Sequence, residues 1–125
     1  MIEIVGKPKY ETKQAIRLCA QNCFEKLNVD KNKILEIIFV DSEKIRRLNA
    51  EYRKIDKATD VLSFPQNNFK SDKLQLFGSI VICEDMMQKT LDSDIKLIQH
   101  GFLHLLGCDH ETDIDSWSEA ESKII

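Results

Sequence analysis

The sequence predicts a single domain of the α+β class, a mixed β-sheet of about four strands with helices packed on it. A chain of 125 residues with 42% hydrophobic and 31% charged residues can bury one core and leaves no room for a second domain. Short β-branched runs alternate with longer segments whose apolar residues recur at helical spacing. The resulting order, β-α-β-α-β-β-α-α-α, favours one mixed sheet covered by helices.

The first half of the chain supplies two strands and two helices. Ile2–Val5 is expected to be a short strand, and Glu11–Leu27 a core-facing helix, because its apolar residues recur at helical spacing. Lys33–Val40 is almost continuously apolar, which is typical of a central strand covered on both faces. Asp41 or Ser42 can cap the next helix, since a short polar side chain there accepts a backbone N–H of the first turn.

The second half begins with a strand at Val61–Phe64, which Pro65 should end because proline cannot donate to a sheet. The polar stretch 66–73 is expected to be a loop or hairpin connection, and Phe77–Cys83 another strand. Three helices are expected after it. They are Glu84–Leu91, Ser93–Leu106 with Asp92 or Ser93 as its cap, and a last helix from about Asp115 to Ile125 with Trp117, Ala120 and Ile124 inside.

Composition also bounds the location of the protein. The first residues have neither a basic start nor a long apolar run, and no window approaches the roughly 20 apolar residues of a membrane helix. We therefore expect a cytoplasmic protein without a membrane segment. The four cysteines show no C-x-x-C pairing, so Cys19, Cys23 and Cys83 are expected to be small buried hydrophobic residues rather than disulfide partners.

Charge is distributed unevenly along the chain, although the net charge is only −3. Six basic residues against two acidic ones lie between Lys44 and Lys57, and six acidic residues without a base lie between Asp109 and Ser122. Either run can be a solvated helix face, and the basic run can equally be a surface for nucleic acid.

All three histidines lie within eleven residues, at the spacing H-x-x-x-H-x-x-G-x-x-H. Residues four apart share one face of a helix and lie about 6 Å apart along it, so His100 and His104 can direct imidazoles at one ion. Gly107 suits the left-handed residue that ends a helix, after which His110 can reach the same ion. Three imidazoles with a vacant fourth position are typical of catalytic zinc, so the motif predicts a site at the helix end for one Zn²⁺ ion.

Two other interpretations of the motif stay open at this point. The histidines can be ordinary residues of a buried helix, or the thiolate of Cys108 can fill the fourth position and make the site structural. If the position is vacant, zinc lowers the pKa of a bound water to about 7, and hydrolysis is the default reaction. Zinc peptidases with this spacing carry a glutamate directly after the first histidine, where this chain has Gly101, which disfavours peptidase activity.

Two further blocks accompany the histidines: Leu48-Asn49-x-x-Tyr52-Arg53 and the run from Thr59 to Pro65, TDVLSFP. Together they resemble the YbeY family of zinc-dependent endoribonucleases involved in ribosomal RNA maturation. The resemblance covers about half of the chain, from Leu48 to His110. It implies single-stranded RNA, above all small-subunit ribosomal RNA, as substrate, a role in ribosome quality control, and small-subunit ribosomal proteins as candidate partners.

The same resemblance implies zinc bound by His100, His104 and His110, and Arg53 as a catalytic residue near the metal. A guanidinium suits this role because its planar fork can hold two phosphate oxygens and stabilise charge on the phosphodiester. Asp109, beside the third histidine, can orient a ligand imidazole or simply face water. Asp60 and Ser63 are candidates for the cleft, with ordering of the turn as the alternative for Asp60.

Three positions depart from the usual pattern of the family. Ser79 stands where members commonly have aspartate, Ala58 replaces a common proline, and Cys108 replaces a common tyrosine or histidine. None of them removes a proposed metal ligand, but the serine can weaken a polar contact that supports the site. A ribosome-assembly factor that uses zinc only to hold its fold, and a peptidase-like hydrolase, are the competing functions.

Overall fold

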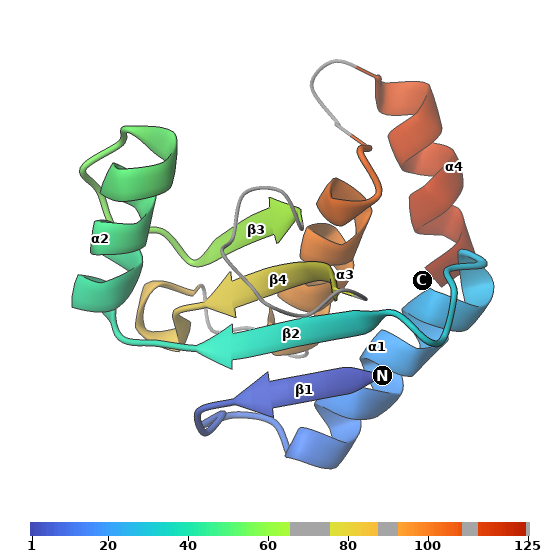
Figure 1. Ribbon diagram of the computed structural model, residues 1–125, viewed down its shortest axis with the longest axis horizontal. Coiled ribbons are helices and arrows are strands. Elements are labelled where there is room, and N and C mark those ends of the chain that lie inside the picture. The colour runs from blue at the N-terminus through green and yellow to red at the C-terminus, as the bar shows by residue number, and fades with distance from the viewer. Residues whose placement is uncertain (66–75, 88–92, 109–112, 125) are drawn as a thin grey trace.

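The structure is a computed structural model that describes residues 1–65, 76–87, 93–108 and 113–124. Figure 1 shows its strands and helices. In chain order they are β1 (Ile2–Val5), α1 (Lys13–Lys26), β2 (Ile34–Phe39), α2 (Ser42–Arg53), β3 (Val61–Pro65), β4 (Leu76–Ile82), the 3-10 turn η1 (Glu84–Met86), α3 (Ser93–Leu105) and α4 (Ile114–Ile124).

The four strands form one mixed sheet in the order β1-β2-β4-β3. β1, β2 and β4 run parallel, and β3 pairs antiparallel with β4 at the edge, with Val61 opposite Ile82 and Pro65 opposite Gly78. The α+β class and the mixed four-stranded sheet expected from the sequence are confirmed. Pro65 is the last residue of β3, which suits an edge strand because its missing N–H removes no bond from the interior of the sheet.

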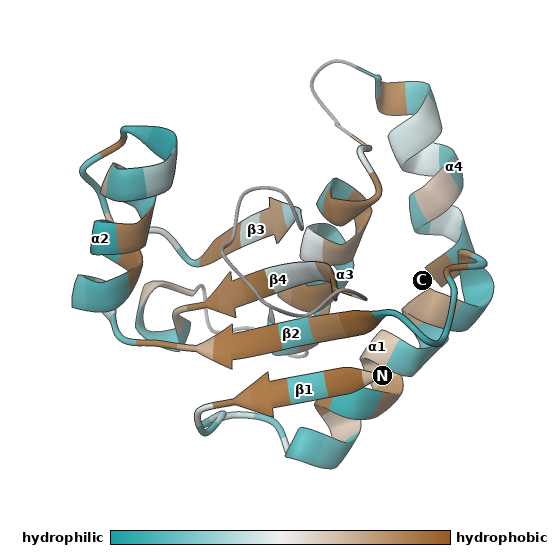
Figure 2. Ribbon diagram, viewed as in Figure 1, coloured by the Kyte–Doolittle hydropathy of each residue, from teal (hydrophilic) through white to brown (hydrophobic). Residues whose placement is uncertain are grey.

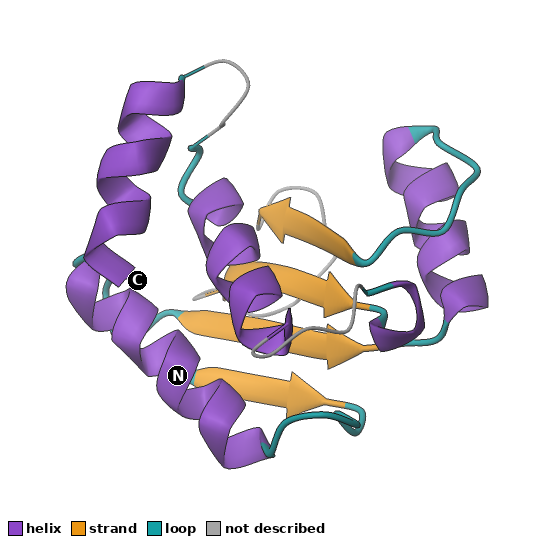
Figure 3. Ribbon diagram, turned by 180° about the vertical axis from the view of Figure 1, so that it is seen from behind, coloured by secondary structure: helices purple, strands orange, loops and turns teal. Residues whose placement is uncertain are grey.

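The helices are divided between the two faces of the sheet. α1, α3 and α4 pack together over one face, where the larger core cluster lies, as the view from behind in Figure 3 shows. α2 stands apart from them and buries Ile45 and Leu48 against Leu62, Phe64 and Val81 on the other face. Hydrophobic residues run along most of each strand in Figure 2, as two separate clusters require.

The sequence predicted that Lys33–Val40, which contains β2, is covered on both faces, but β4 is the strand with this environment. β2 is interior to the sheet, but only Leu35 and Ile37 on its one face are buried, while Glu36 and Ile38 on the other are half-buried. β4 is the strand with both faces covered, since Ile80 and the residues after it are fully buried against α3 on one side and α2 on the other.

Two helix starts use short polar side chains as caps. The first helix begins two residues later than expected, because Thr12 accepts a hydrogen bond from the Ala15 backbone N–H at 3.0 Å. Of the two caps considered for α2, Asp41 is the one used, with its carboxylate accepting from the Lys44 N–H at 2.8 Å.

The prediction of a helix at Glu84–Leu91 is wrong for its first four residues, 84–87. Only a 3-10 turn forms, at Glu84–Met86, and Met87 returns to an extended backbone conformation. The side chain of Glu84 turns inward and accepts backbone N–H groups of the loop after β1, so this segment serves as a connection. Residues 88–92, with the rest of the expected helix and the cap Asp92, lie outside the described residues, as do 66–75 and Ile125.

The four cysteines are free thiols, as expected. Cys23 and Cys83 are buried, whereas Cys19 is half-buried. Over the part of the chain that the structure describes, no helix is long and apolar enough to cross a membrane.

Candidate metal centre

Helix α3 is seated on β4 by two glycines. A Cβ atom at Gly101 would lie 3.0–3.1 Å from the side chain of Ile80, and one at Gly78 would lie 2.6 Å from the side chain of Leu105. The absence of side chains at these two points allows helix and strand to approach closely. α3 therefore runs antiparallel to β4, and its histidines occupy the faces that do not touch the sheet.

The imidazoles of His100 and His104 converge, as the sequence spacing requires. Their Nε2 atoms lie 3.0 Å apart and their ring centroids 4.6 Å apart. Both side chains are half-buried. This separation is within hydrogen-bond distance, and the tautomers of the two rings determine which one donates.

This geometry fits a divalent metal ion. Two nitrogens bound to one tetrahedral zinc ion at about 2.0–2.1 Å lie about 3.3 Å apart, so small rotations of the rings would admit the ion. Neutral imidazoles are also the form in which histidine binds metals. His100 and His104 together therefore offer two nitrogen ligands near the end of α3.

The end of α3 has the conformation that the sequence predicts. Gly107 has φ +87°, its N–H donates to the carbonyl of His104, and the N–H of Cys108 donates to the carbonyl of Leu103. These two bonds form a Schellman motif, which ends the helix at Gly107. Two predicted site residues that follow, Asp109 and His110, lie outside the described residues.

Cys108 does not complete a metal site with the pair. Among the residues that the structure describes, no group of three His, Cys, Asp or Glu side chains could hold an ion. Cys108 packs against the larger core cluster instead. Within the described residues, the Cys108 thiol thus forms no three-ligand group with His100 and His104.

Helix α4 brings an aromatic wall to the histidines. The indole ring of Trp117 lies 4.9 Å from the ring of His100 and 5.2 Å from that of His104, measured between centroids. Its Nε1–H donates to Glu121 Oε2 at 3.3 Å. Sequence periodicity placed Trp117 on the inner side of its helix but could not show that the histidines are what it packs against.

A cavity of about 310 Å³ lies between α3 and α4, beside His100. It is lined by Lys96, Gln99, His100, Leu103 and Glu121. His100 therefore faces open space on one side and the indole of Trp117 on another.

The two cleft candidates on β3 occupy different positions. Ser63 pairs with Ile80, the residue under Gly101, and shares the face of the sheet on which α3 packs. The carbonyl of Asp60 accepts from the N–H of Cys83, three residues or roughly 10 Å farther along β4, toward the start of α3. The structure thus brings Ser63, and not Asp60, to the middle of α3.

Ser79 faces away from the histidines. Its hydroxyl is fully buried and donates to Glu36 Oε1 on the neighbouring strand at 3.1 Å. An aspartate at this position would put two carboxylates next to each other, so Glu36 gives a physical reason for serine here. Ser79 thus contacts the neighbouring strand β2, and Ala58 packs against the smaller cluster.

Arg53 is the last residue of α2 and is exposed. Tyr52 anchors this last turn by packing edge-on against Phe64, with centroids 5.3 Å apart. Asn49 holds the following loop by donating to the carbonyl of Lys57 at 2.8 Å. α2, which ends at Arg53, and α3, which carries the histidine pair, pack on opposite faces of the sheet.

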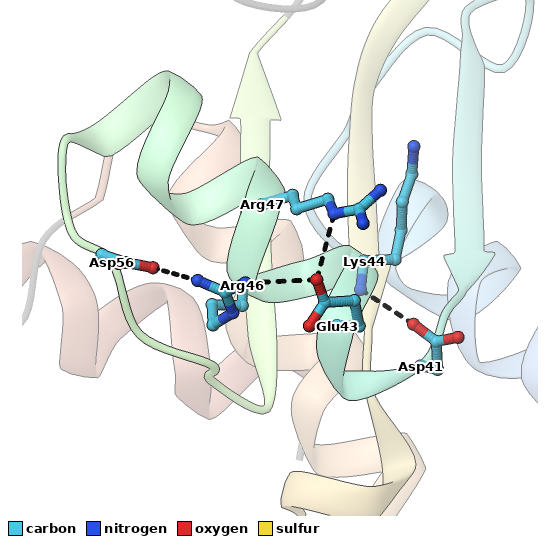
Figure 4. Close-up of polar contacts among 6 residues, drawn as sticks. All are labelled: Asp41, Glu43, Lys44, Arg46, Arg47 and Asp56. Atoms are coloured by element: carbon cyan, nitrogen blue, oxygen red, sulfur yellow. Dashed lines mark hydrogen bonds and ion pairs between the residues drawn. The ribbon is translucent and has the colours of Figure 1, made fainter.

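Figure 4 shows how the other two arginines of α2 are engaged. Arg46 pairs with Glu43 and Asp56, and Arg47 pairs with Glu43 at 3.2 Å. Arg46, and to a smaller degree Arg47, holds the pKa of Glu43 below its usual value. Within the described residues Arg53 makes no hydrogen bond or ion pair, so its guanidinium is the one left available to a ligand.

Comparisons with known proteins identify the family of this chain. The family model described as Endoribonuclease YbeY matches residues 3–123. Relatives with that name include a protein of Sulfurimonas denitrificans, 43% identical over 75% of this chain and 71% of its own length. Another, from Sulfurihydrogenibium sp., is 35% identical over 98% of this chain and 84% of its own length.

The fold is also found in a solved structure. The solution structure of TM1509 from Thermotoga maritima superposes with a TM-score of 0.51 at 21% sequence identity, covering 99% of this chain and 89% of that one. The match of the family model over nearly the whole sequence and the identity to its members lead to one conclusion: the chain belongs to the YbeY endoribonuclease family.

Proposed function

We propose that this protein is a metal-dependent endoribonuclease that cuts single-stranded RNA in the maturation of small-subunit ribosomal RNA and in ribosome quality control. The observation that carries the proposal is the 3.0 Å separation of the Nε2 atoms of His100 and His104, in a chain whose relatives are named endoribonucleases. Small-subunit ribosomal proteins as partners, and a cytoplasmic location, stay predictions on the same basis.

One Zn²⁺ ion is the proposed cofactor. His100 and His104 would hold it, and the sequence spacing supplies His110 as the third ligand. When bound, zinc supplies a Lewis acid for the phosphodiester and lowers the pKa of water beside it. The two described imidazoles contribute by presenting both Nε2 atoms to one point before any ion arrives.

Arg53 is proposed to bind the RNA backbone. Its free guanidinium can hold two oxygens of one phosphate, which a lysine cannot do because its ammonium is a single point charge. Because α2 and α3 both pack on β3, from opposite faces of the sheet, the proposal requires an RNA strand that passes over β3 from the end of α2 to α3. Arg46 and Arg47 contribute less, because Glu43 and Asp56 already neutralise them.

The peptidase alternative is disfavoured by the position of Gly101. A glutamate there would point at Ile80 in the core rather than toward the open side of the histidines. The residue that serves as general base in zinc peptidases thus has no equivalent at this place in the helix.

The proposal is tested by zinc content and by cleavage of a labelled single-stranded RNA, compared with the same RNA annealed to its complement. Wild-type protein should bind about one zinc ion and cut only the single strand, and His104→Ala should lose both properties. Cleavage that persists in metal-free His104→Ala protein would refute the proposal.

Two outcomes of this experiment separate the remaining alternatives. A factor that uses zinc only to hold its fold would bind RNA without cutting it and would unfold on metal removal. Analysis of the product ends then identifies the attacking group. A cyclic phosphate on the upstream fragment indicates attack by the neighbouring ribose hydroxyl, and its absence indicates attack by water.

A further inference from the structure

We propose that Trp117 and Glu121 of α4 are positioning residues that hold the imidazoles of His100 and His104 in their metal-binding orientation. The inference rests on the metal-dependent function proposed above. Trp117 is 5% exposed and its ring approaches both imidazoles, at 4.9 and 5.2 Å between centroids. One buried side chain from a neighbouring helix therefore touches both proposed ligands at once.

Glu121 sets the orientation of the indole. The carboxylate lies one helical turn after Trp117 and accepts its Nε1–H at 3.3 Å. An indole has one side-chain donor, and here that donor points at Glu121 rather than at the histidines. The surface that faces the imidazoles is therefore carbon, which packs against the rings without competing for the nitrogens that would bind metal.

The indole limits the rotation of two rings that are only partly buried. Both rings are half-buried, and a cavity of about 310 Å³ lies beside His100. A half-exposed imidazole can turn about two side-chain torsions, and only a few of those rotamers bring both Nε2 atoms to one point. Loss of the indole would leave His100 free to turn into the space that Trp117 and the cavity together provide.

The same geometry gives Glu121 a role that its neighbour Glu119 lacks. Glu119 lies on the exposed side of α4, where its carboxylate is 4.0 Å from Lys123 and its side chain is 76% exposed. The two glutamates stand on one helix and differ in whether they touch Trp117. Glu119 is therefore a matched control for any effect of charge or helix propensity.

The test measures zinc affinity by competition with a chromogenic chelator, together with the ¹⁵N signals of the imidazoles in metal-free protein. Removing groups that orient metal ligands typically weakens binding 10–100-fold, and we expect this loss for Trp117→Leu. Glu121→Leu should weaken binding about 3–10-fold, whereas Trp117→Phe, Glu121→Gln and Glu119→Leu should stay within about 3-fold of wild type. Of the two substitutions at Trp117, only Trp117→Leu should broaden the imidazole signals, because Trp117→Phe keeps an aromatic ring beside the histidines.

The outcomes distinguish this inference from the function on which it rests. If wild-type protein binds no zinc, the proposed metal centre is wrong and the positioning role falls with it. If wild type binds zinc and folded Trp117→Leu binds it equally well, only the positioning role is overturned. Should Trp117→Leu fail to fold, Glu121→Leu decides, because zinc affinity equal to that of Glu119→Leu would contradict the role.

Discussion

Gly101 lies so close to Ile80 that a Cβ atom at position 101 would stand 3.0–3.1 Å from three carbons of the isoleucine side chain. This contact fixes the height and rotation of α3 over β4. The rotation in turn directs His100 and His104 away from the sheet and toward α4. A packing requirement in the core thus determines where the proposed metal ligands point.

Gly101→Ala should destabilise the fold. Ile80 is fully buried and cannot move aside, so the added methyl group overpacks the seam at a cost of about 1–3 kcal/mol, against a gain of about 1 kcal/mol in helix propensity. Urea unfolding should show a net loss of about 1 kcal/mol. Ser118→Ala on the exposed side of α4 should change stability by less than about 0.5 kcal/mol. Unchanged or higher stability of Gly101→Ala would show that α3 can move away from β4 to make room for the methyl group.

Arg53→Ala should lower RNA cleavage about 100-fold while leaving unfolding unchanged, since the side chain is exposed and its proposed role is to stabilise charge on the phosphate. Arg47→Ala removes the same side chain from the same helix, but one that is already paired with Glu43. Its cleavage rate should stay within about 3-fold of wild type, because an exposed pair contributes little. Equal losses in the two variants would mean that the basic helix acts only through its total charge.

Trp117, the chain's only tryptophan, should report metal binding through its fluorescence. Its ring contacts both proposed ligands, so Co²⁺ at the site should quench its emission, and Zn²⁺, with a closed d shell, should change the emission less. In His104→Ala the quenching should require far more Co²⁺. If neither ion changes the fluorescence of wild-type protein at concentrations well above that of the protein, the proposed metal site is contradicted.

Stability should fall as the pH rises from about 4 to about 7, because of Asp94. Burial first, then the neighbouring Glu84 and Glu11, raise the pKa of this carboxyl from 3.8 to about 7 in the folded protein. In that interval the folded state keeps a proton that the unfolded state has lost, so the stabilising contribution is complete below pH 3.8 and is lost as the pH passes about 7.

Asp94→Asn should remove this dependence and be more stable than wild type above pH 7, by about 1–4 kcal/mol. Urea unfolding between pH 4 and 8 provides the measurement. Asp85→Asn is the control, because Asp85 is half-exposed and pairs with Lys9 on the surface. A wild-type stability that is flat over this interval, or that rises with pH, would show that Asp94 is ionised in the folded protein.

Structural features that depend on residues close together in the chain could be predicted from the sequence. The cap at Asp41 and the left-handed Gly107 depend on residues within four positions of one another, and the expected bounds of α1, α3 and α4 lie within about two residues of those found. The spacing of His100 and His104 likewise determined their convergence, because four residues on a helix always return to one face.

Helix and strand burial could not be read in the same way. The segment Glu84–Leu91 was expected to be a helix, but Glu84 accepts the backbone N–H groups of Lys9 and Tyr10, which lie far away in the chain. Continuous apolar residues in β2 suggested two covered faces, whereas the order of the strands gave that environment to β4. Both outcomes depend on partners that periodicity does not identify.

The sequence by itself determined the family, the histidine motif and the elements that carry it, because these depend on residue identity and on spacing along one helix. Only the tertiary structure decided that Trp117 stands against the histidines, that Ser79 contacts Glu36 on the neighbouring strand, and that α2, which ends at Arg53, packs on the opposite face of the sheet from α3. These relations join residues from different helices and strands, and they exist only once the core has fixed how those elements pack.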